Sequence, residues 1–155
     1  MTRINVIDPG LLTNEHVLAE WRELPRIARE LESHPTRYKP QDTPPFYTLG
    51  KGHVKFFRNK LKYLENRHRL LTDEALRRGM SLSHGALDLS SLDLAPQIRQ
   101  FCLNDWEPTP DAIAENIERI QERLFLRKKD YHIRDTKIST DGDVARYMDF
   151  LAFHT

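Results

Sequence analysis

Residues 13–31 read TNEHVLAEWRELPRIAREL and carry the clearest fold signal in the chain. Apolar side chains recur there at helical spacing, and this period predicts an amphipathic helix with one face toward a core. The apolar positions are Val17, Leu18, Trp21, Leu24, Ala28 and Leu31. Pro25 lies inside the pattern, where it removes a backbone donor and crowds the preceding turn. A kink or break is therefore expected between Trp21 and Leu24.

Two later stretches also carry helical periodicity. From about His53 the apolar stripe continues to Gly79, which suits a left-handed helix end, so we expect one long helix or two consecutive ones. Thr109 precedes Pro110 and Asp111, a strong helix start, and isoleucines continue that stripe to about Phe125.

The remaining chain gives weaker signals. Residues 34–52 are polar and rich in proline, which predicts a surface loop. Residues 81–102 are predicted to be mostly irregular, with one short helix near 95–102, and residues 140–143 can cap a last short helix. We find neither a repeat nor a glycine-rich phosphate loop nor strand alternation in the sequence.

These patterns predict an all-α fold. A length of 155 residues suits one domain, so we expect a compact single-domain bundle of about three main helices spanning 1–155. The N-terminus is expected to be extended and the connecting loops long. Residues from about 135 onward are expected to form a C-terminal extension of the domain.

The composition is that of a soluble globular protein, with 39% hydrophobic and 30% charged residues. An apolar run near the roughly 18 residues of a membrane span is absent from the sequence, and the polar start argues against a secretory signal. We expect a cytoplasmic protein without a membrane partner. The single Cys102 is expected to be a buried small hydrophobe.

The seven histidines are scattered without ligand spacing, so a metal site is not expected. His53, beside Gly52, is expected to be structural or to contact the backbone. His16 is an evenly balanced candidate, because a lone helix histidine is often a satisfied structural group.

Positive charge is concentrated in two tracts although the formal net charge is only +1. The first comprises Lys51, Lys55, Arg58, Lys60, Lys62, Arg67 and Arg69, and the second Arg119, Arg123, Arg127, Lys128, Lys129 and Arg134. Such tracts are often solvated helix faces. Together with the arginines near the N-terminus, they favour a nucleic-acid partner.

The first residues offer a nucleophile. Removal of Met1 would expose the α-amine of Thr2, whose reference pKa of about 7.7–8.0 leaves part of it unprotonated at neutral pH. Such an amine can form a Schiff base with little tuning. Glu23 adds a carboxylate among arginines suited to phosphates. The alternatives are an ordinary chain terminus and a surface ion network.

Several motifs resemble the phage-type pyrimidine-dimer DNA glycosylase family, also called the endonuclease V type of phage. They cover roughly the first half of the chain, and the match is weaker beyond it, where Asp105-Trp106, Pro108 and the helix bearing Arg119 and Arg123 are similar in placement. The motifs are Met1-Thr2-Arg3-Ile4-Asn5, His16, Ala19-Glu20, Arg22-Glu23-Leu24-Pro25-Arg26, Leu49-Gly50-Lys51-Gly52-His53-Val54-Lys55-Phe56-Phe57, Lys60-Leu61 and Arg78-Gly79.

This resemblance implies a small, metal-free DNA-repair enzyme that needs no cofactor. The enzyme would act on double-stranded ultraviolet-damaged DNA, cleaving a glycosidic bond and nicking the strand by β-elimination. We expect it to be a monomer. The catalytic groups would be the α-amine of Thr2 and the carboxylate of Glu23. Phosphate, lesion or active-site contacts correspond to Arg3, His16, Arg22, Arg26, Arg119 and Arg123.

The chain departs from the family near its end. The phage member has an aromatic and basic segment that engages the lesion, whereas residues 128–134 read KKDYHIR and only Tyr131 keeps the aromatic character. Tyr131 is therefore the candidate lesion contact, and the preferred lesion stays open. Two alternatives also stay open: a non-catalytic DNA-binding relative, and a lyase acting only on abasic or other damaged sites.

Overall fold

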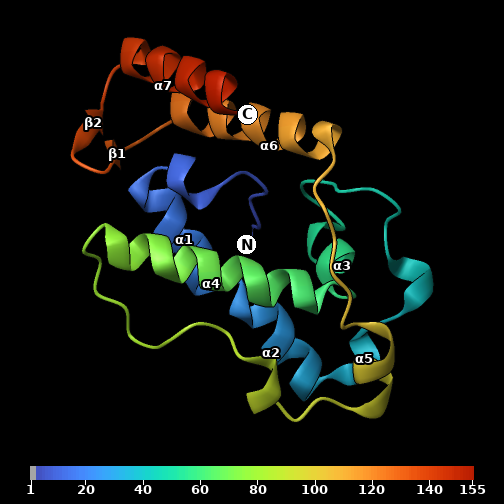
Figure 1. The fold of residues 1–155 in the computed structure, drawn as a ribbon. Coiled ribbons are helices and arrows are strands. Elements are labelled where there is room, and N and C mark those ends of the chain that lie inside the picture. Colours follow the sequence, from blue (N-terminus) through green and yellow to red (C-terminus); the bar gives the residue numbers. More distant parts are fainter. Residues whose placement is uncertain (1–2) are drawn as a thin grey trace.

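The computed structural model describes residues 3–155, which fold into helices joined by long loops and one short β-hairpin (Figure 1). The α-helices are α1 (Asn14–Glu23), α2 (Pro25–Ser33), α3 (His53–Phe57), α4 (Leu61–Arg77), α5 (Pro96–Phe101), α6 (Pro110–Phe125) and α7 (Asp141–His154). Single 3-10 turns are η1 (Pro9–Leu11), η2 (Pro35–Arg37), η3 (Pro40–Asp42) and η4 (Leu89–Ser91). The fold is thus mostly helical, as predicted.

The predicted break at Pro25 is confirmed. The hydroxyl of Thr13 caps α1 by accepting from the backbone N–H of His16, and α1 ends at Glu23. Pro25 then begins α2 at the first helical position, where its missing N–H costs no hydrogen bond. Leu24 joins the two helices in right-handed helical conformation and is fully buried.

The predicted helices after residue 53 are also present. The stripe from His53 to Gly79 forms two consecutive helices, α3 and α4, and Gly79 has the expected positive φ of 80°. The short helix expected near 95–102 is α5, and Cys102 just after it is fully buried. Thr109 caps α6 by accepting from the backbone N–H of Ala112.

The prediction of an all-α fold was wrong at one place. Strands β1 (Tyr131–Ile133) and β2 (Thr136–Ile138) form an antiparallel hairpin in which Ile133 pairs with Thr136. The last helix was also underestimated, because α7 runs for 14 residues and is comparable with α6, which has 16. The bundle therefore has α7 in addition to the three main helices expected.

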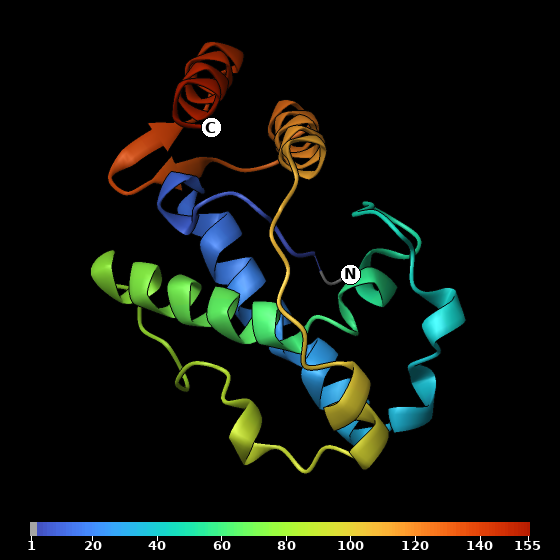
Figure 2. The same ribbon diagram turned by 45° about the vertical axis from the view of Figure 1, so that its right-hand side comes forward.

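Helix α7 packs along α6 and against β2, so the C-terminal residues lie on the bundle (Figures 1 and 2). A capping box starts it, in which Thr140 and Asp143 each bond the other's backbone. The hydroxyl of Tyr147 donates to the carbonyl of Leu11, 2.7 Å away, and ties α7 to the N-terminal region.

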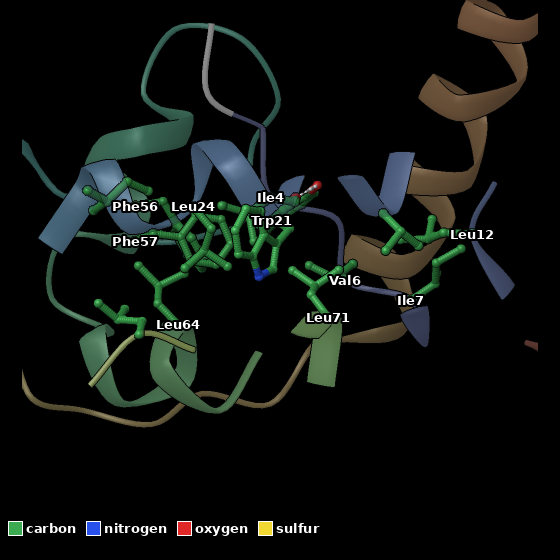
Figure 3. Packing of buried hydrophobic residues seen from close by; sticks show 14 of the residues in the cluster. Ile4, Val6, Ile7, Leu12, Trp21, Leu24, Phe56, Phe57, Leu64 and Leu71 are labelled. Atoms are coloured by element: carbon green, nitrogen blue, oxygen red, sulfur yellow. Dashed lines mark hydrogen bonds between the residues drawn. The ribbon is translucent and has the colours of Figure 1, made fainter. Parts of the chain in front are cut away.

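The extended N-terminal segment forms part of the core. Ile4, Val6 and Ile7 are at most 6% exposed and pack among residues from α1, α3 and α4, as Figure 3 shows. Aliphatic and aromatic side chains of this size stabilise a fold by about 1.5–3 kcal/mol each when buried. The burial fixes the path of the chain that leads to the N-terminus.

Within residues 3–155, none of the helices combines the length and apolar character needed to cross a membrane.

Candidate active site

One cavity brings together five of the predicted site residues. It has a volume of about 280 Å³ and is bounded by the N-terminal segment, α1, α6 and β1. Its walls are Arg3, Asn5, His16, Arg119, Ile120, Arg123 and Tyr131. Sequence positions 3, 16, 119, 123 and 131, far apart in the chain, thus share one concave site.

The two arginines of α6 reach this cavity together because they are four residues apart on one helix. Ile120, beside Arg119, is 2% exposed and anchors this face of α6 against the core. The predicted pairing of Arg119 with Arg123 on one face is consistent with this arrangement.

The cavity is strongly electropositive. Burial lowers the pKa of Arg3 from its ordinary value, and repulsion from Arg123 and Arg119 lowers it further. Arg119 is close to one carboxylate, Glu122, at 3.3 Å. Within residues 3–155, neither Arg3 nor Arg123 forms an ion pair. Guanidinium groups without carboxylate partners suit an anionic ligand such as a phosphate.

His16 lines the same cavity as a neutral imidazole. Burial is the main cause that lowers its pKa to about 4, and the positive charges of Arg3, Arg123 and Lys129 add to the effect. Its Nδ1 lies 2.8 Å from the hydroxyl of Thr13, the residue that caps α1. At neutral pH, His16 can therefore form a hydrogen bond with a ligand without adding charge to the cavity.

Tyr131, on β1, also forms part of the cavity wall. Its ring stacks on that of His16, with centroids 5.4 Å apart, and the ammonium of Lys129 lies 5.7 Å from the centre of the same ring. The hairpin that carries Tyr131 is held by α1. Asn14 donates to the carbonyl of Arg134 at 2.9 Å and accepts from its N–H at 3.0 Å.

Glu23, Arg22 and Arg26 do not line the cavity. Glu23 is seven residues after His16 on α1, hence on the same side of the helix and about 10 Å along its axis. Its carboxylate accepts from Arg26 at 2.8 Å, and its side chain is 26% exposed. Arg22 and Arg26 are exposed. These residues therefore form a second charged area beside the cavity.

Thr2, the predicted nucleophile, lies outside the described residues. Arg3, its neighbour in the chain, is the first described residue and lines the cavity.

A buried polar network beneath the cavity was missed in the sequence. Asn5 donates to Glu20 at 3.0 Å and accepts from Asn116 at 2.8 Å, while Arg67 binds both carboxylate oxygens of Glu20. All four side chains are at most 5% exposed. A signal was available, since Glu20 lies on the apolar stripe three residues after Val17 and four before Leu24. A charged residue in such a position requires a buried partner.

A larger cavity, of about 450 Å³, lies elsewhere on the molecule, between the N-terminal segment and α4. Its walls include the carboxylates of Asp8, Asp73 and Glu74, and the two arginines that also line it are already paired, Arg67 with Glu20 and Arg77 with Glu74. Because carboxylates repel phosphates, the smaller arginine-lined cavity is the better candidate for an anionic ligand.

A comparison with protein families gives an independent result. The sequence model of a family described as pyrimidine dimer DNA glycosylase matches residues 1–88. This range includes the N-terminal segment, α1, α2, α3 and α4.

Proposed function

Because the chain belongs to the pyrimidine dimer DNA glycosylase family, we propose that it excises pyrimidine dimers from duplex DNA and then nicks the strand as an AP lyase. Family membership supports the glycosylase role and DNA as the substrate. The lyase step, the nucleophile and the individual contacts are our proposal.

The observation that best supports it is the cavity shared by Arg3, Arg119 and Arg123. Three guanidinium groups around one concave site match the charge of a DNA backbone, to which most protein–DNA hydrogen bonds are made. A glycosylase also needs room beside its phosphate contacts for a displaced nucleotide. The stacked rings of His16 and Tyr131 offer an aromatic surface for a base at that place.

We assign the nucleophile to the α-amine of Thr2. Its lone pair attacks C1′ of the damaged nucleotide, the new C–N bond forms, and the base leaves with the electrons of the glycosidic bond. A proton passes from the nitrogen to the ring oxygen as the sugar opens to an iminium ion. Removal of a C2′ proton then expels the phosphate at C3′ and nicks the strand.

Glu23 is the proposed carboxylate of this chemistry. Attack at C1′ develops positive charge on the sugar, which a nearby carboxylate stabilises. The same group can carry the proton from the nitrogen to the ring oxygen. Glu23 and the cavity lie along one side of α1, so a strand that runs along this side would contact both. Arg22 and Arg26, exposed near Glu23, would then bind phosphates beyond the cavity.

Borohydride trapping tests this proposal directly. Incubation with a duplex containing an abasic site and borohydride is expected to give a covalent adduct at residue 2 of the mature chain. Absence of any adduct would leave a non-catalytic DNA-binding protein. A second duplex, with a cyclobutane dimer, tests the glycosylase step, and cleavage of the abasic duplex alone would reduce the activity to that of a lyase.

A further inference from the structure

The peptide group of Ile4 is held on both sides by buried side chains. Its N–H donates to Nε2 of His53 at 2.8 Å. Its carbonyl accepts from the hydroxyl of Tyr47 at 3.2 Å. In residues 3–155, these are the first hydrogen bonds that the backbone makes, so the fixed path of the N-terminal segment begins at Ile4.

His53 is suited to this contact by its own surroundings. Its Nδ1 lies 2.8 Å from the carbonyl of Thr48, which accepts only, so Nδ1 carries the hydrogen and Nε2 is left as an acceptor. The side chain is 3% exposed, and the rings of Tyr47 and Phe57 meet it edge-on. A neutral imidazole of one tautomer is thus fixed in one orientation.

The same segment is held further along. The N–H of Val6 donates to Asn116 at 2.8 Å, and the carbonyl of Ile7 accepts from Arg67. These contacts come from α6 and α4, whereas His53 begins α3. The Ile4 contact is the one nearest to the N-terminal amine among them.

We propose that His53 is a positioning residue for the N-terminal amine, because its bond to the N–H of Ile4 sets the direction in which the terminus leaves the core. This inference rests on the proposed function of the amine. Consecutive Cα atoms are about 3.8 Å apart, so the Cα of residue 2 must lie within about 7.6 Å of that of Ile4. A fixed Ile4 therefore limits the positions that a reacting amine can take.

The charge state of His53 agrees with this role. Its pKa is lowered to about 4, mainly by burial and to a smaller extent by the charges of Arg3 and Arg119, against the opposite effect of the Thr48 carbonyl. His53 is therefore neutral at the pH at which an α-amine is partly unprotonated. A protonated ring would place a second N–H against that of Ile4 and lose the bond.

The rival interpretation is that His53 only fills space in the core. The two interpretations differ in what substitution does to the chemistry of correctly folded molecules. His53→Leu keeps an apolar side chain but lacks the acceptor, whereas His53→Gln can offer an amide oxygen to Ile4. His68 is a matched control, since it also accepts from a backbone N–H, of Leu87 at 2.7 Å, and lies 2.9 Å from a backbone carbonyl, of Trp21.

The experiment measures two quantities in the full chain. One is the hydrogen-exchange rate of the Ile4 amide, followed by NMR. The other is the single-turnover rate of borohydride trapping on an abasic duplex, with DNA affinity measured in parallel. In His53→Leu we expect exchange at Ile4 to rise and trapping to slow by about tenfold or more, since small displacements of a reacting group are costly. DNA affinity should change by less than about twofold, because phosphate contacts remain.

The variants separate the possible outcomes. His53→Gln should recover most of the trapping rate, and His68→Leu should lower the melting temperature but trap at the wild-type rate per folded molecule. If His53→Leu does not fold, His53→Phe, which keeps a ring but lacks the acceptor for the Ile4 N–H, is expected to slow trapping by at least about threefold. Wild-type trapping rates in a folded His53→Leu or His53→Phe protein would overturn the inference alone. Absence of trapping in the wild-type protein would overturn the proposed function as well.

Discussion

The ring of Tyr131 lies nearly parallel to that of His16, with the centroids 5.4 Å apart and the planes inclined by 25°. One residue comes from the C-terminal hairpin and the other from the first turn of α1. The contact therefore joins the part of the chain that the family model matches, residues 1–88, to a part that it does not.

We expect Tyr131 to contact a base in the complex with DNA. Tyr131→Ala should weaken binding to a dimer-containing duplex by about 1–3 kcal/mol, the contribution of one base stacked on an aromatic side chain. Tyr131→Phe, which keeps the ring, should bind almost as well as the wild type. Fluorescence anisotropy on damaged and undamaged duplexes measures both. If Tyr131→Ala binds both duplexes with the affinity of the wild type, Tyr131 does not contact the DNA.

Arg123 should make a phosphate contact. It is exposed, lines the cavity and, among residues 3–155, has no carboxylate partner. Arg123→Gln is expected to reduce the slope of log affinity against log salt by about 0.9, the value for one lost phosphate contact. Arg146→Gln is the matched control, because Arg146 is also exposed but binds Asp143 on α7. The proposal for Arg123 fails if both variants keep the wild-type slope.

Glu23→Gln should bind DNA and lose most turnover. The amide is close in shape to the carboxylate but carries no charge and cannot relay a proton, so we expect a rate lower by about 10²–10⁴-fold. Single-turnover cleavage of an abasic duplex measures this rate, beside an affinity measurement. Glu30→Gln is the control, since Glu30, on α2, also pairs with an arginine, Arg37. A near-normal rate for the Glu23 variant would exclude its proposed role.

The predicted features that the structure confirms depend on local chemistry. The break at Pro25 follows from one missing donor, and the α6 start at Thr109 follows from one capping hydroxyl. The proximity of Arg119 to Arg123 needs only the helical period. Such features depend on a few neighbouring residues and not on tertiary contacts with the rest of the chain.

The hairpin could not be predicted in this way. Arg134, at its turn, has a φ of 52°, a conformation that Gly or Asn adopts more readily, so the usual turn signal is absent. The turn is held instead by Asn14, and the strand by Glu15, which accepts from the N–H of His132. These partners lie more than a hundred positions earlier in the chain, and their contribution is therefore tertiary.

The arrangement of the candidate site was predicted only in part. The sequence groups Glu23 with Arg22 and Arg26, and the structure keeps them adjacent on α1 and α2 but outside the cavity walls. Arg3 lies at the cavity beside α6 and β1, because the burial of Ile4, Val6 and Ile7 holds the N-terminal segment in that place. Residues that belong to one sequence motif can therefore lie apart in the fold, because tertiary burial of nearby residues fixes where each of them is placed.

Stability should fall on mild acidification partly because of His53. Its pKa is about 4 in the folded protein, against an ordinary value of 6.5, so between these values the unfolded chain binds more protons. The contribution of neutral His53 is then complete above about pH 6.5 and decreases as the pH falls toward about 4. The unfolding free energy from urea titrations, plotted against pH across this range, should have a shallower slope in His53→Gln than in the wild type, by up to about one proton. Equal slopes would mean that His53 titrates normally in the fold.

The buried pair of Glu20 and Arg67 should be the most sensitive contact beneath the site. The guanidinium Nε lies 2.8 Å from one carboxylate oxygen, and both side chains are at most 5% exposed. Arg67→Met leaves Glu20 buried without its cation and is expected to cost about 3–5 kcal/mol of unfolding free energy. Adding Glu20→Gln should recover part of this loss, since it removes the unpaired charge. Lys62→Met, at the exposed pair with Glu65, should cost less than about 1 kcal/mol in the same urea titration. Equal losses of unfolding free energy in Arg67→Met and Lys62→Met would show that Glu20 remains hydrated. The position of the N-terminal segment would then not depend on this network.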